Sequence, residues 1–195
     1  MPVAIDTILI GVALTDGKQD IMLFSDAGKA MRFAEDEVRP MGRNARGVRG
    51  MTLEEGQSVI AMLVAEDEQQ SVLTATENGY GKRTSIVEYT RHGRGTKGMI
   101  AIQQSERNGK VVAATLVHAD DEIMLITDTG VLVRTRVAEI REMGRATQGV
   151  TLISLDEGAK LNGLQRIVEN DANASGGDAH AVDARGSWCH DLRVA

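Results

Sequence analysis

Short apolar runs recur along the chain, and polar turns that end in glycine separate them. The first run of each set covers residues 21–25, 72–76 and 123–127, and the turns that follow end in Gly28, Gly79 and Gly130. A second run leaves each turn, at residues 29–33, 80–84 and 131–135. A polar turn with glycine between two apolar runs is typical of a β-hairpin, because glycine readily adopts the positive φ that the turn requires. The pattern therefore predicts three hairpins.

Two further runs follow each predicted hairpin. The third run covers residues 48–52, 99–103 and 150–154, and the fourth covers 59–64, 111–117 and 164–168. Residues 8–14 form a run of the fourth type, which predicts a strand of a preceding repeat within residues 4–14. Helix-like patterns are weak and short, at residues 34–38 and 135–140.

The runs belong to an internal repeat of 51 residues. Three glycine series keep this spacing, and so do three series of charged residues: Gly28, Gly79, Gly130; Gly42, Gly93, Gly144; Gly47, Gly98, Gly149; Arg32, Arg83, Arg134; Glu37, Glu88, Glu139; Arg43, Arg94, Arg145. Four short strands in about 51 residues are typical of one blade of a propeller-like array, whose blades must pack on neighbours to bury their faces.

We therefore predict an all-β fold of about three four-stranded, propeller-like repeats, at about residues 20–70, 71–121 and 122–168. Hydrophobic residues make up 42% of the chain and aromatic residues 3%, so the core must be aliphatic. Residues 169–195 are rich in Ala, Gly, Asp and Asn and have no strand pattern, which predicts a disordered tail.

Targeting signals and membrane segments do not stand out. The first ten residues lack the basic flank and apolar run of a signal peptide, and no stretch of about 18 apolar residues occurs. The sequence has one cysteine, Cys189, which excludes a disulfide within the chain. These features predict a cytoplasmic protein with no membrane partner.

Charge is sorted by loop, although the formal net charge of −6 argues against a nucleic-acid partner. Residues 39–49 contain four arginines and no acid, and residues 91–98 contain three basic residues other than histidine and no acid. The equivalent third loop is weaker, because Glu142 lies between Arg141 and Arg145. Equivalent loops of successive blades lie on one edge, so we expect a positive track that neutralises DNA phosphates. The alternative is that the glycines set the turns and the arginines are solvated surface.

The predicted DNA-binding residues lie in these loops and in or beside the second strands. In the loops they are Arg39, Arg43, Arg46, Arg49, Arg91, Arg94, Lys97 and Arg145. By the strands they are Arg32, Lys82, Arg83, Arg134 and Arg136.

Several joined stretches resemble the later blades of the C-terminal domain of the DNA gyrase A subunit. They are 79–84 (GYGKRT), 96–98 (TKG), 106–109 (ERNG), 127–137 (TDTGVLVRTRV), 143–145 (MGR) and 147–150 (TQGV). The resemblance covers roughly residues 4–168. It implies a β-pinwheel, a bacterial and nucleoid-associated location, and bending of double-stranded DNA around a basic rim. It also implies partnership with the gyrase B subunit, and with the remainder of the gyrase A subunit, in ATP-dependent negative supercoiling.

The chain departs from that family in one motif. The first blade of the family carries the box Gln-Arg-Arg-Gly-Gly-Lys-Gly, which is needed for full wrapping, and no such string occurs here. Residues 94–98 (RGTKG) are a degenerate counterpart. Two rivals stay open: the corresponding domain of topoisomerase IV, and a propeller-like protein-interaction module.

Catalytic motifs are weak by comparison. Residues 93–98 fit G-x-G-x-x-G, but a strand-like run follows where a dinucleotide site needs a helix. Tyr89 falls in an apolar column and is expected in the core, while Tyr80 lies in a predicted strand. The four histidines and Cys189 show no metal-ligand spacing. The sequence predicts no catalytic residue, cofactor or metal, and an enzyme built on a propeller is the least favoured class.

Overall fold

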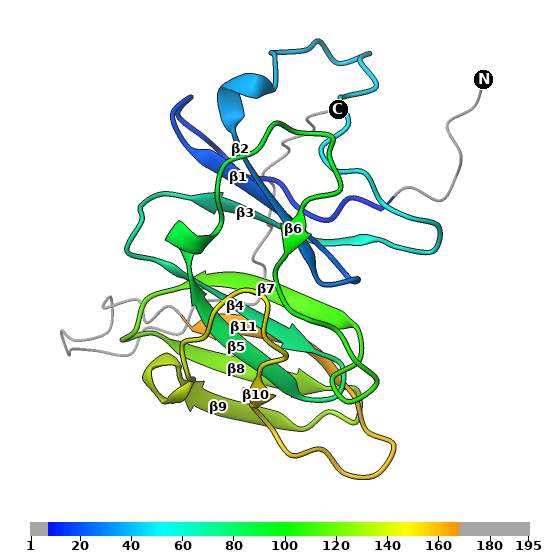
Figure 1. The fold of residues 1–195 in the computed structure, drawn as a ribbon, viewed down its shortest axis with the longest axis vertical. Coiled ribbons are helices and arrows are strands. Elements are labelled where there is room, and N and C mark those ends of the chain that lie inside the picture. Colours follow the sequence, from blue (N-terminus) through cyan, green and yellow to red (C-terminus); the bar gives the residue numbers. More distant parts are fainter. Residues whose placement is uncertain (1–7, 168–195) are drawn as a thin grey trace, which may run out of the picture.

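Three antiparallel sheets follow one another along the chain in the computed structural model, which describes residues 8–167 (Figure 1). The first sheet contains β1 (Asp20–Ser25), β2 (Lys29–Ala34) and β3 (Val59–Ala65). The second contains β4 (Ser71–Thr76), β5 (Tyr80–Ser85) and β7 (Val111–Val117). The third contains β8 (Glu122–Thr127), β9 (Leu132–Arg136) and β11 (Leu161–Ile167). The all-β fold and its three propeller-like repeats are confirmed, and we call each sheet a blade.

Each of the first two blades borrows its fourth strand from the following repeat. The strand β6 (Met99–Ile100) pairs with β2, and β10 (Val150–Thr151) pairs with β5. The sheet orders are therefore β3-β1-β2-β6, β10-β5-β4-β7 and β11-β8-β9. The third blade has three strands among the described residues.

This exchange corrects the prediction that every repeat holds four strands of its own. Residues 48–52 form no strand, and the third-type strands of the later repeats have only two residues each. A third-type strand forms on the sheet of the preceding blade, and no such sheet precedes the first blade among the described residues.

Three other predictions of local structure are wrong or refined. Residues 8–14 form no strand, although Gly11 lies beside Met62 of the edge strand β3, and Ile8 and Leu14 are 82% and 90% exposed. The two helix-like segments are single 3₁₀ turns, η1 (Glu35–Glu37) and η3 (Val137–Glu139). The second repeat has the same turn, η2 (Ile86–Glu88). The predicted tail 169–195 lies outside the described residues, as do Val168 and residues 4–7 of the predicted first strand.

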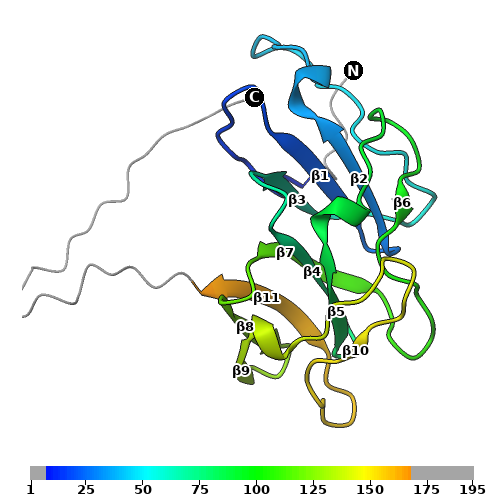
Figure 2. The ribbon, with the colours of Figure 1, turned by 60° about the vertical axis from the view of Figure 1, so that its left-hand side comes forward.

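The core lies between blades as well as within them. Met22 and Phe24 of the first blade pack in one cluster with Val72 and Tyr89 of the second, and the rings of Phe24 and Tyr89 meet edge-on at 6.0 Å. A second cluster joins the last two blades, with Leu73, Val117, Ile123, Leu125 and Val137 among its members. Apart from Phe24 and Tyr89 these side chains are aliphatic or Met, as the composition predicts. The stacking of the blades is seen edge-on in Figure 2.

Glycines allow the borrowed strands to approach closely. Gly98 precedes β6 with φ +71°, and a Cβ there would overlap the carbonyl oxygen of Ala30. Gly149 precedes β10 with φ +82°, and its Cβ would lie 2.7 Å from the oxygen of Gly81. Gly47, the same position of the first repeat, would meet nothing within 4 Å. The repeated glycine therefore serves the junction between blades, and at the first repeat that junction is open.

Candidate nucleic-acid interface

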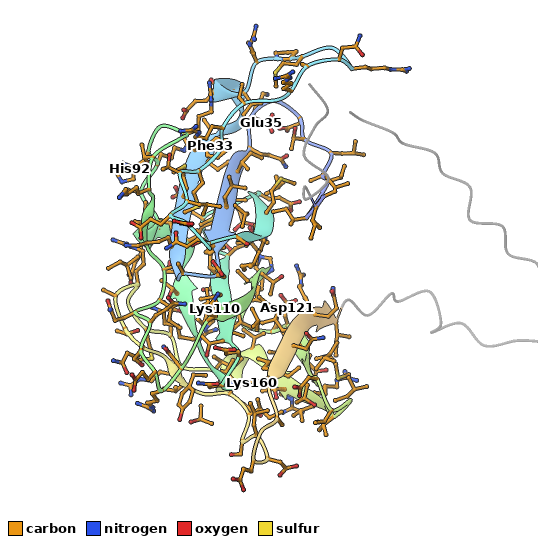
Figure 3. All side chains as sticks on the ribbon, turned by 90° about the vertical axis from the view of Figure 1, so that its right-hand side faces the viewer. Phe33, Glu35, His92, Lys110, Asp121 and Lys160 are labelled. Carbon is orange, nitrogen blue, oxygen red and sulfur yellow. The ribbon has the colours of Figure 1, made fainter. Side chains whose placement is uncertain are left out.

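Three equivalent loops connect the second and third elements of each repeat, and we call residues 38–50, 89–98 and 140–149 the first, second and third rim loops. The second and third loops lie on the side of the molecule that carries β6 and β10, at the right in Figure 2, and the first loop runs from the top of that view toward the same side. Residues beside them hydrogen-bond to the next loop in the same way at both junctions: the Thr52 amide donates to the Thr96 carbonyl at 2.8 Å, and the Gln103 amide donates to the Thr147 carbonyl at 2.9 Å. In Figure 3, His92 of the second loop marks this edge, and Asp121 lies toward the other.

The first rim loop carries four exposed arginines, Arg39, Arg43, Arg46 and Arg49. The structure gives their side chains no hydrogen bond or ion pair with any described residue, and the loop contains no acid. A backbone hydrogen bond from Ala45 to Gly42 closes a turn that spaces Arg43 from Arg46. Unpaired guanidinium groups in water are the groups that can neutralise phosphates.

In the second rim loop, the basic side chains bond to other residues of the protein. Arg91 pairs with Asp20 at 2.8 Å, and this contact raises the pKa of Arg91. Arg94 donates through Nε to the carbonyl of Glu37 at 3.0 Å and through Nη1 to that of Arg49 at 3.2 Å. Lys97 is exposed and pairs with the exposed carboxylate of Glu54 at 3.2 Å, a contact that phosphate can replace.

The third rim loop has less free positive charge. Arg145 donates to the carbonyl of Ile100 at 2.8 Å, which is the contact that Arg94 makes with Arg49 one repeat earlier. Glu142 pairs with Arg83 of the second blade at 3.7 Å. Arg141 is exposed, and no side-chain partner of it lies among the described residues.

Two of the predicted site residues are buried at the junctions between blades. Arg32 pairs with Asp20 at 2.6 Å and donates to the carbonyls of Ile86 and Tyr89, each at 3.2 Å. Lys82 is fully buried, donates to the carbonyl of Gly144 at 2.5 Å and also bonds that of Arg145.

Their surroundings set them apart from the rim. Burial lowers the pKa of the Lys82 ammonium to about 8. Both side chains bond backbone carbonyls of the neighbouring repeat, and both are too buried to contact a phosphate. We therefore exclude Arg32 and Lys82 from the proposed interface.

Three more predicted residues lie next to acids. Arg83 is half-buried beside Glu142. Arg134 and Arg136 both reach Glu122, and an open pocket of about 460 Å³ beside them is lined by further residues of both signs. The structure thus leaves the four arginines of the first rim loop exposed, whereas the strand arginines and Arg91 of the second loop are paired with acids.

Sequence reasoning missed the residues that fix the rim loops. The carboxylate of Glu37 accepts the amide of Arg94 at 3.1 Å, and that of Glu88 accepts the amide of Arg145 at 2.9 Å. The 51-residue series of glutamates was the available signal, but the bond crosses from one blade to the next. Arg107 was also missed, and its guanidinium lies 4.6 Å from the ring centre of Tyr80.

Metal-ligating groups, membrane-spanning helices and the buried Tyr89 concern the remaining candidate chemistry. Among residues 8–167 no group of three His, Cys, Asp or Glu side chains is placed to hold a metal ion, and no helix has the length and apolarity to cross a membrane. Tyr89 is fully buried, as expected from its apolar column, and burial raises the pKa of its hydroxyl.

These features define a class: a propeller-like repeat protein whose blades exchange strands and whose loops line one rim. The model of the "DNA gyrase C-terminal domain, beta-propeller" family matches residues 19–66, 70–118 and 121–167. The chain therefore belongs to the family of DNA gyrase A C-terminal domains.

Similar proteins agree with this assignment. The chain is 55% identical over 170 residues to the DNA gyrase A subunit of Pseudomonas aeruginosa, covering 87% of this chain and 18% of that protein. It is 53% identical over 161 residues to the Escherichia coli counterpart, covering 83% and 18%. A solved DNA gyrase A C-terminal domain superposes with a TM-score of 0.72 at 29% identity, covering 77% of this chain and 51% of that one. A topoisomerase IV C-terminal domain superposes with a TM-score of 0.80 at 24% identity, which shows the fold alone.

Proposed function

We propose that this chain is a non-catalytic module that binds and bends duplex DNA along its rim loops. The observation that carries the proposal is the first rim loop, which contains no acid and whose four exposed arginines have no hydrogen bond or ion pair with a described residue. In the second loop, Arg91 and Lys97 extend the same rim with side chains 62% and 72% exposed. A row of such groups supplies the sequence-independent part of DNA affinity through counterion release.

The positive charge falls from the first rim loop to the third, and this gradient shapes the proposal. Bending a 20–30 base-pair site by 40–90° costs about 1–6 kcal/mol, which contacts along the rim must offset. The third loop offers Arg141 beside Glu142, and its Arg145 side chain is bonded within the protein. We therefore expect firm binding at the first two loops and modest bending overall.

The wider role rests on relatives that are much longer. The chain spans about a fifth of the curated DNA gyrase A subunits that it matches. We propose that it acts in the cytoplasm with the gyrase B subunit, and with the rest of a gyrase A subunit, where bent DNA supports ATP-dependent negative supercoiling. The matches to gyrase A at 55% and 53% identity favour this role over that of a topoisomerase IV domain. The acid-free first loop favours it over a protein-interaction module.

Salt-dependent binding to duplex DNA tests the interface. The variant Arg43→Gln/Arg46→Gln removes two charges from the first loop, and its matched control Arg134→Gln/Arg136→Gln removes two charges beside Glu122. Each phosphate contact contributes about 0.9 to the slope of log affinity against log salt, so the loop variant should lose about 2 in slope and roughly 50-fold in affinity at 0.1 M salt. The control should lose about threefold or less, since Asp120, Asp121 and Glu122 line the same pocket and offset its charges. Equal losses in the two variants would remove the first loop from the interface.

A topology assay tests bending. Plasmid is relaxed by a separate topoisomerase in the presence of this chain or of the solved gyrase A C-terminal domain, of which this chain covers 51%. At equal occupancy this chain should shift the linking number clearly less than the longer domain. Equal shifts would contradict the argument that the charge gradient limits bending.

A further inference from the structure

The turn that precedes the last strand of each blade is one residue longer in the second repeat, before β7, than before β3 and β11. A backbone bond closes the turn over three residues in the first and third repeats and over four in the second. These bonds run from the amides of Gln57, Ala159 and Gly109 to the carbonyls of Glu54, Asp156 and Ser105, respectively. The shorter turns read Glu-Glu-Gly and Asp-Glu-Gly, and the longer one reads Glu-Arg-Asn-Gly. Arg107 and Asn108 therefore stand where each of the other repeats has one acid.

Asn108 attaches the longer turn to the third rim loop. Its side chain is buried and donates to the carbonyls of Gln103 and Gln148, at 2.9 and 3.0 Å. The carbonyl of Arg107 accepts the side-chain amide of Asn78 at 3.0 Å. Figure 2 shows this turn, between β6 and β7, on the same side of the molecule as β10. The backbone around Arg107 is therefore fixed beside the third rim loop.

The exposed side chain of Arg107 lies against the ring of Tyr80. Its guanidinium is 4.6 Å from the ring centre, and it makes no ion pair with a described residue. A hydrogen bond from this guanidinium lowers the pKa of the Tyr80 hydroxyl. Tyr80 itself lies opposite Thr151 in the pairing of β5 with β10, directly after the third rim loop. A guanidinium held against a ring by cation–π attraction keeps N–H donors on its outer side, and these match the oxygens of a phosphate.

The two junctions between blades carry this positive charge on opposite sides. At the first junction the rim loop supplies Lys97, and the preceding turn supplies its partner Glu54 at 3.2 Å. At the second junction the rim loop has the uncharged Gln148 at the repeat position of Lys97, and the turn supplies Arg107. Turn and rim loop are in contact at both junctions. Arg107 therefore places a cation beside the position where the third rim loop lacks one.

We propose that Arg107 binds a DNA phosphate at the second junction, held in place by the ring of Tyr80 and replacing the charge that the third rim loop lacks at Gln148. The inference rests on the proposed binding of duplex DNA along the rim loops, and it adds a residue from outside them. Tyr80 is a positioning residue in this arrangement. Its ring limits the freedom of a long side chain, so less conformational entropy is lost when the phosphate binds. The third rim loop still carries less positive charge than the first, because it contains Glu142.

Salt-dependent binding of the full chain to mixed-sequence duplex DNA tests the contact. Arg107→Gln should lower the slope of log affinity against log salt by about 0.9, and the affinity about eightfold at 0.1 M salt. The matched control Lys18→Gln removes another exposed cation, which lines a pocket with Glu66 and Asp67. The control should keep the slope of the parent. An unchanged slope in Arg107→Gln, or an equal loss in the control, would overturn the proposal.

Moving the charge separates a phosphate contact from a purely structural role of Arg107. In Arg107→Gln/Gln148→Lys the cation returns to the rim loop, as in Lys97 at the first junction, and both slope and affinity should recover. The bond from Asn108 to residue 148 survives in this variant, because its acceptor is the backbone carbonyl. A double variant that binds no better than Arg107→Gln would show that charge at this place does not contact DNA.

The role of Tyr80 is tested through its ring. Tyr80→Leu removes the ring but not the charge of Arg107, so the salt slope should stay and the affinity should fall about threefold, as expected for an exposed cation–π contact. Tyr80→Phe keeps the ring and should retain most of the affinity that Tyr80→Leu loses. Equal losses in the two variants would show that the ring does not position Arg107.

A measurement without DNA checks the contact between the two side chains. The chain has two tyrosines, and burial raises the pKa of Tyr89, so an absorbance titration of the folded protein reports on Tyr80 at the lower pH. The pKa of Tyr80 should rise in Arg107→Gln, because the guanidinium that lowers it is gone. An unchanged pKa would overturn the contact, and with it the proposal.

The first-loop variant Arg43→Gln/Arg46→Gln distinguishes failure of this inference from failure of the proposed function. If that variant loses slope while Arg107→Gln does not, DNA binds along the rim and only the contact at Arg107 is wrong. If the parent chain shows no salt-dependent binding to duplex DNA, both proposals fail together.

Discussion

The junction between the first two blades and the junction between the last two share one backbone design and differ in their charges. At both, the borrowed segment donates to the hairpin glycine: the Ala101 and Leu152 amides each lie 2.8 Å from the carbonyls of Gly28 and Gly79. Lysines bridge the blades near the hairpin turns in both cases, from Lys110 to Asp26 at 3.2 Å and from Lys160 to Glu77 at 3.8 Å. The close backbone approach is therefore the constant part of the repeat.

The charged side chains at the two junctions differ. The first junction buries Asp20 between Arg32 and Arg91, at 2.6 and 2.8 Å. In the second, Ser71 takes the place of the aspartate, and the acid opposite Arg83 is the half-exposed Glu142 of the next loop. The same repeat position thus supports a buried ion network at one junction and a solvated pair at the other. The difference shows that the repeat constrains geometry more tightly than charge.

Removing the acid at each junction should have the largest effect and tests whether the two junctions differ. Asp20→Asn leaves the buried guanidinium of Arg32 without its counter-charge, and breaking a buried pair costs about 3–5 kcal/mol. Glu142→Gln removes a half-exposed partner, for which we expect a loss of about 1 kcal/mol or less. Denaturant unfolding of both variants measures the two values. Similar losses would mean that the two junctions do not differ as their burial indicates.

The second prediction concerns Lys82, which stands where the first blade has the buried Met31. Burial lowers the pKa of Lys82 to about 8 from its usual 10.5. Between these pH values the unfolded chain holds the proton more tightly than the folded chain, so the free energy of unfolding should rise with pH through this range. At about 1.4 kcal/mol per pH unit, the full rise is about 3 kcal/mol.

The substitution Lys82→Met copies the first blade into the second and should abolish that rise. Hydrogen bonds to the carbonyls of Gly144 and Arg145 are lost at every pH, so they affect the offset between the two proteins. The measured quantity is the difference in unfolding free energy between parent and variant, taken at pH 7 and at pH 10. A difference that stays constant would show that Lys82 keeps an ordinary pKa in the folded protein.

The third prediction sets a closed junction against the open end. Gly98→Ala and Gly47→Ala both place alanine at positive φ, which costs about 1 kcal/mol in each. The Gly98 variant must also push its Cβ against the carbonyl of Ala30, which adds about 2 kcal/mol. Thermal or denaturant unfolding should therefore separate the two variants by about 2 kcal/mol. No separation would contradict the role assigned to the repeated glycine.

Much of the blade could be predicted because its signals are local. The hairpins β1–β2, β4–β5 and β8–β9 follow from apolar runs on either side of a turn glycine, and all three form. The third-type strands could not be placed, since Met99 pairs with Ala30, far away along the chain and in another repeat. Period alone cannot say whether a strand lies on its own sheet or on a neighbour's.

The site shows the same limit. The spacing of basic residues grouped the rim loops, but it could not distinguish the exposed Arg43 from the buried Arg32, because the partners of Arg32 come from the next repeat. For the same reason Lys82 was predicted to contact DNA, although its partners are the carbonyls of the third rim loop. Residues exposed on the rim and residues buried between blades recur with the same 51-residue spacing. Three-dimensional contacts are needed to tell the two kinds apart.

The smallest expected effect concerns the glutamate series that fixes the rim loops. Glu88 accepts the amide of Arg145 at 2.9 Å, whereas Glu139, at the same repeat position, has no partner among the described residues. A solvent-exposed hydrogen bond of this kind stabilises by about 1 kcal/mol. Glu88→Ala should therefore lower the free energy of unfolding by about that amount, and Glu139→Ala by a few tenths at most. Hydrogen exchange distinguishes the two variants, because the Arg145 amide should lose protection in Glu88→Ala alone. If that amide exchanges equally fast in the parent and in Glu88→Ala, the bond does not hold the third rim loop, and the loops of successive blades are fixed by their backbone contacts instead.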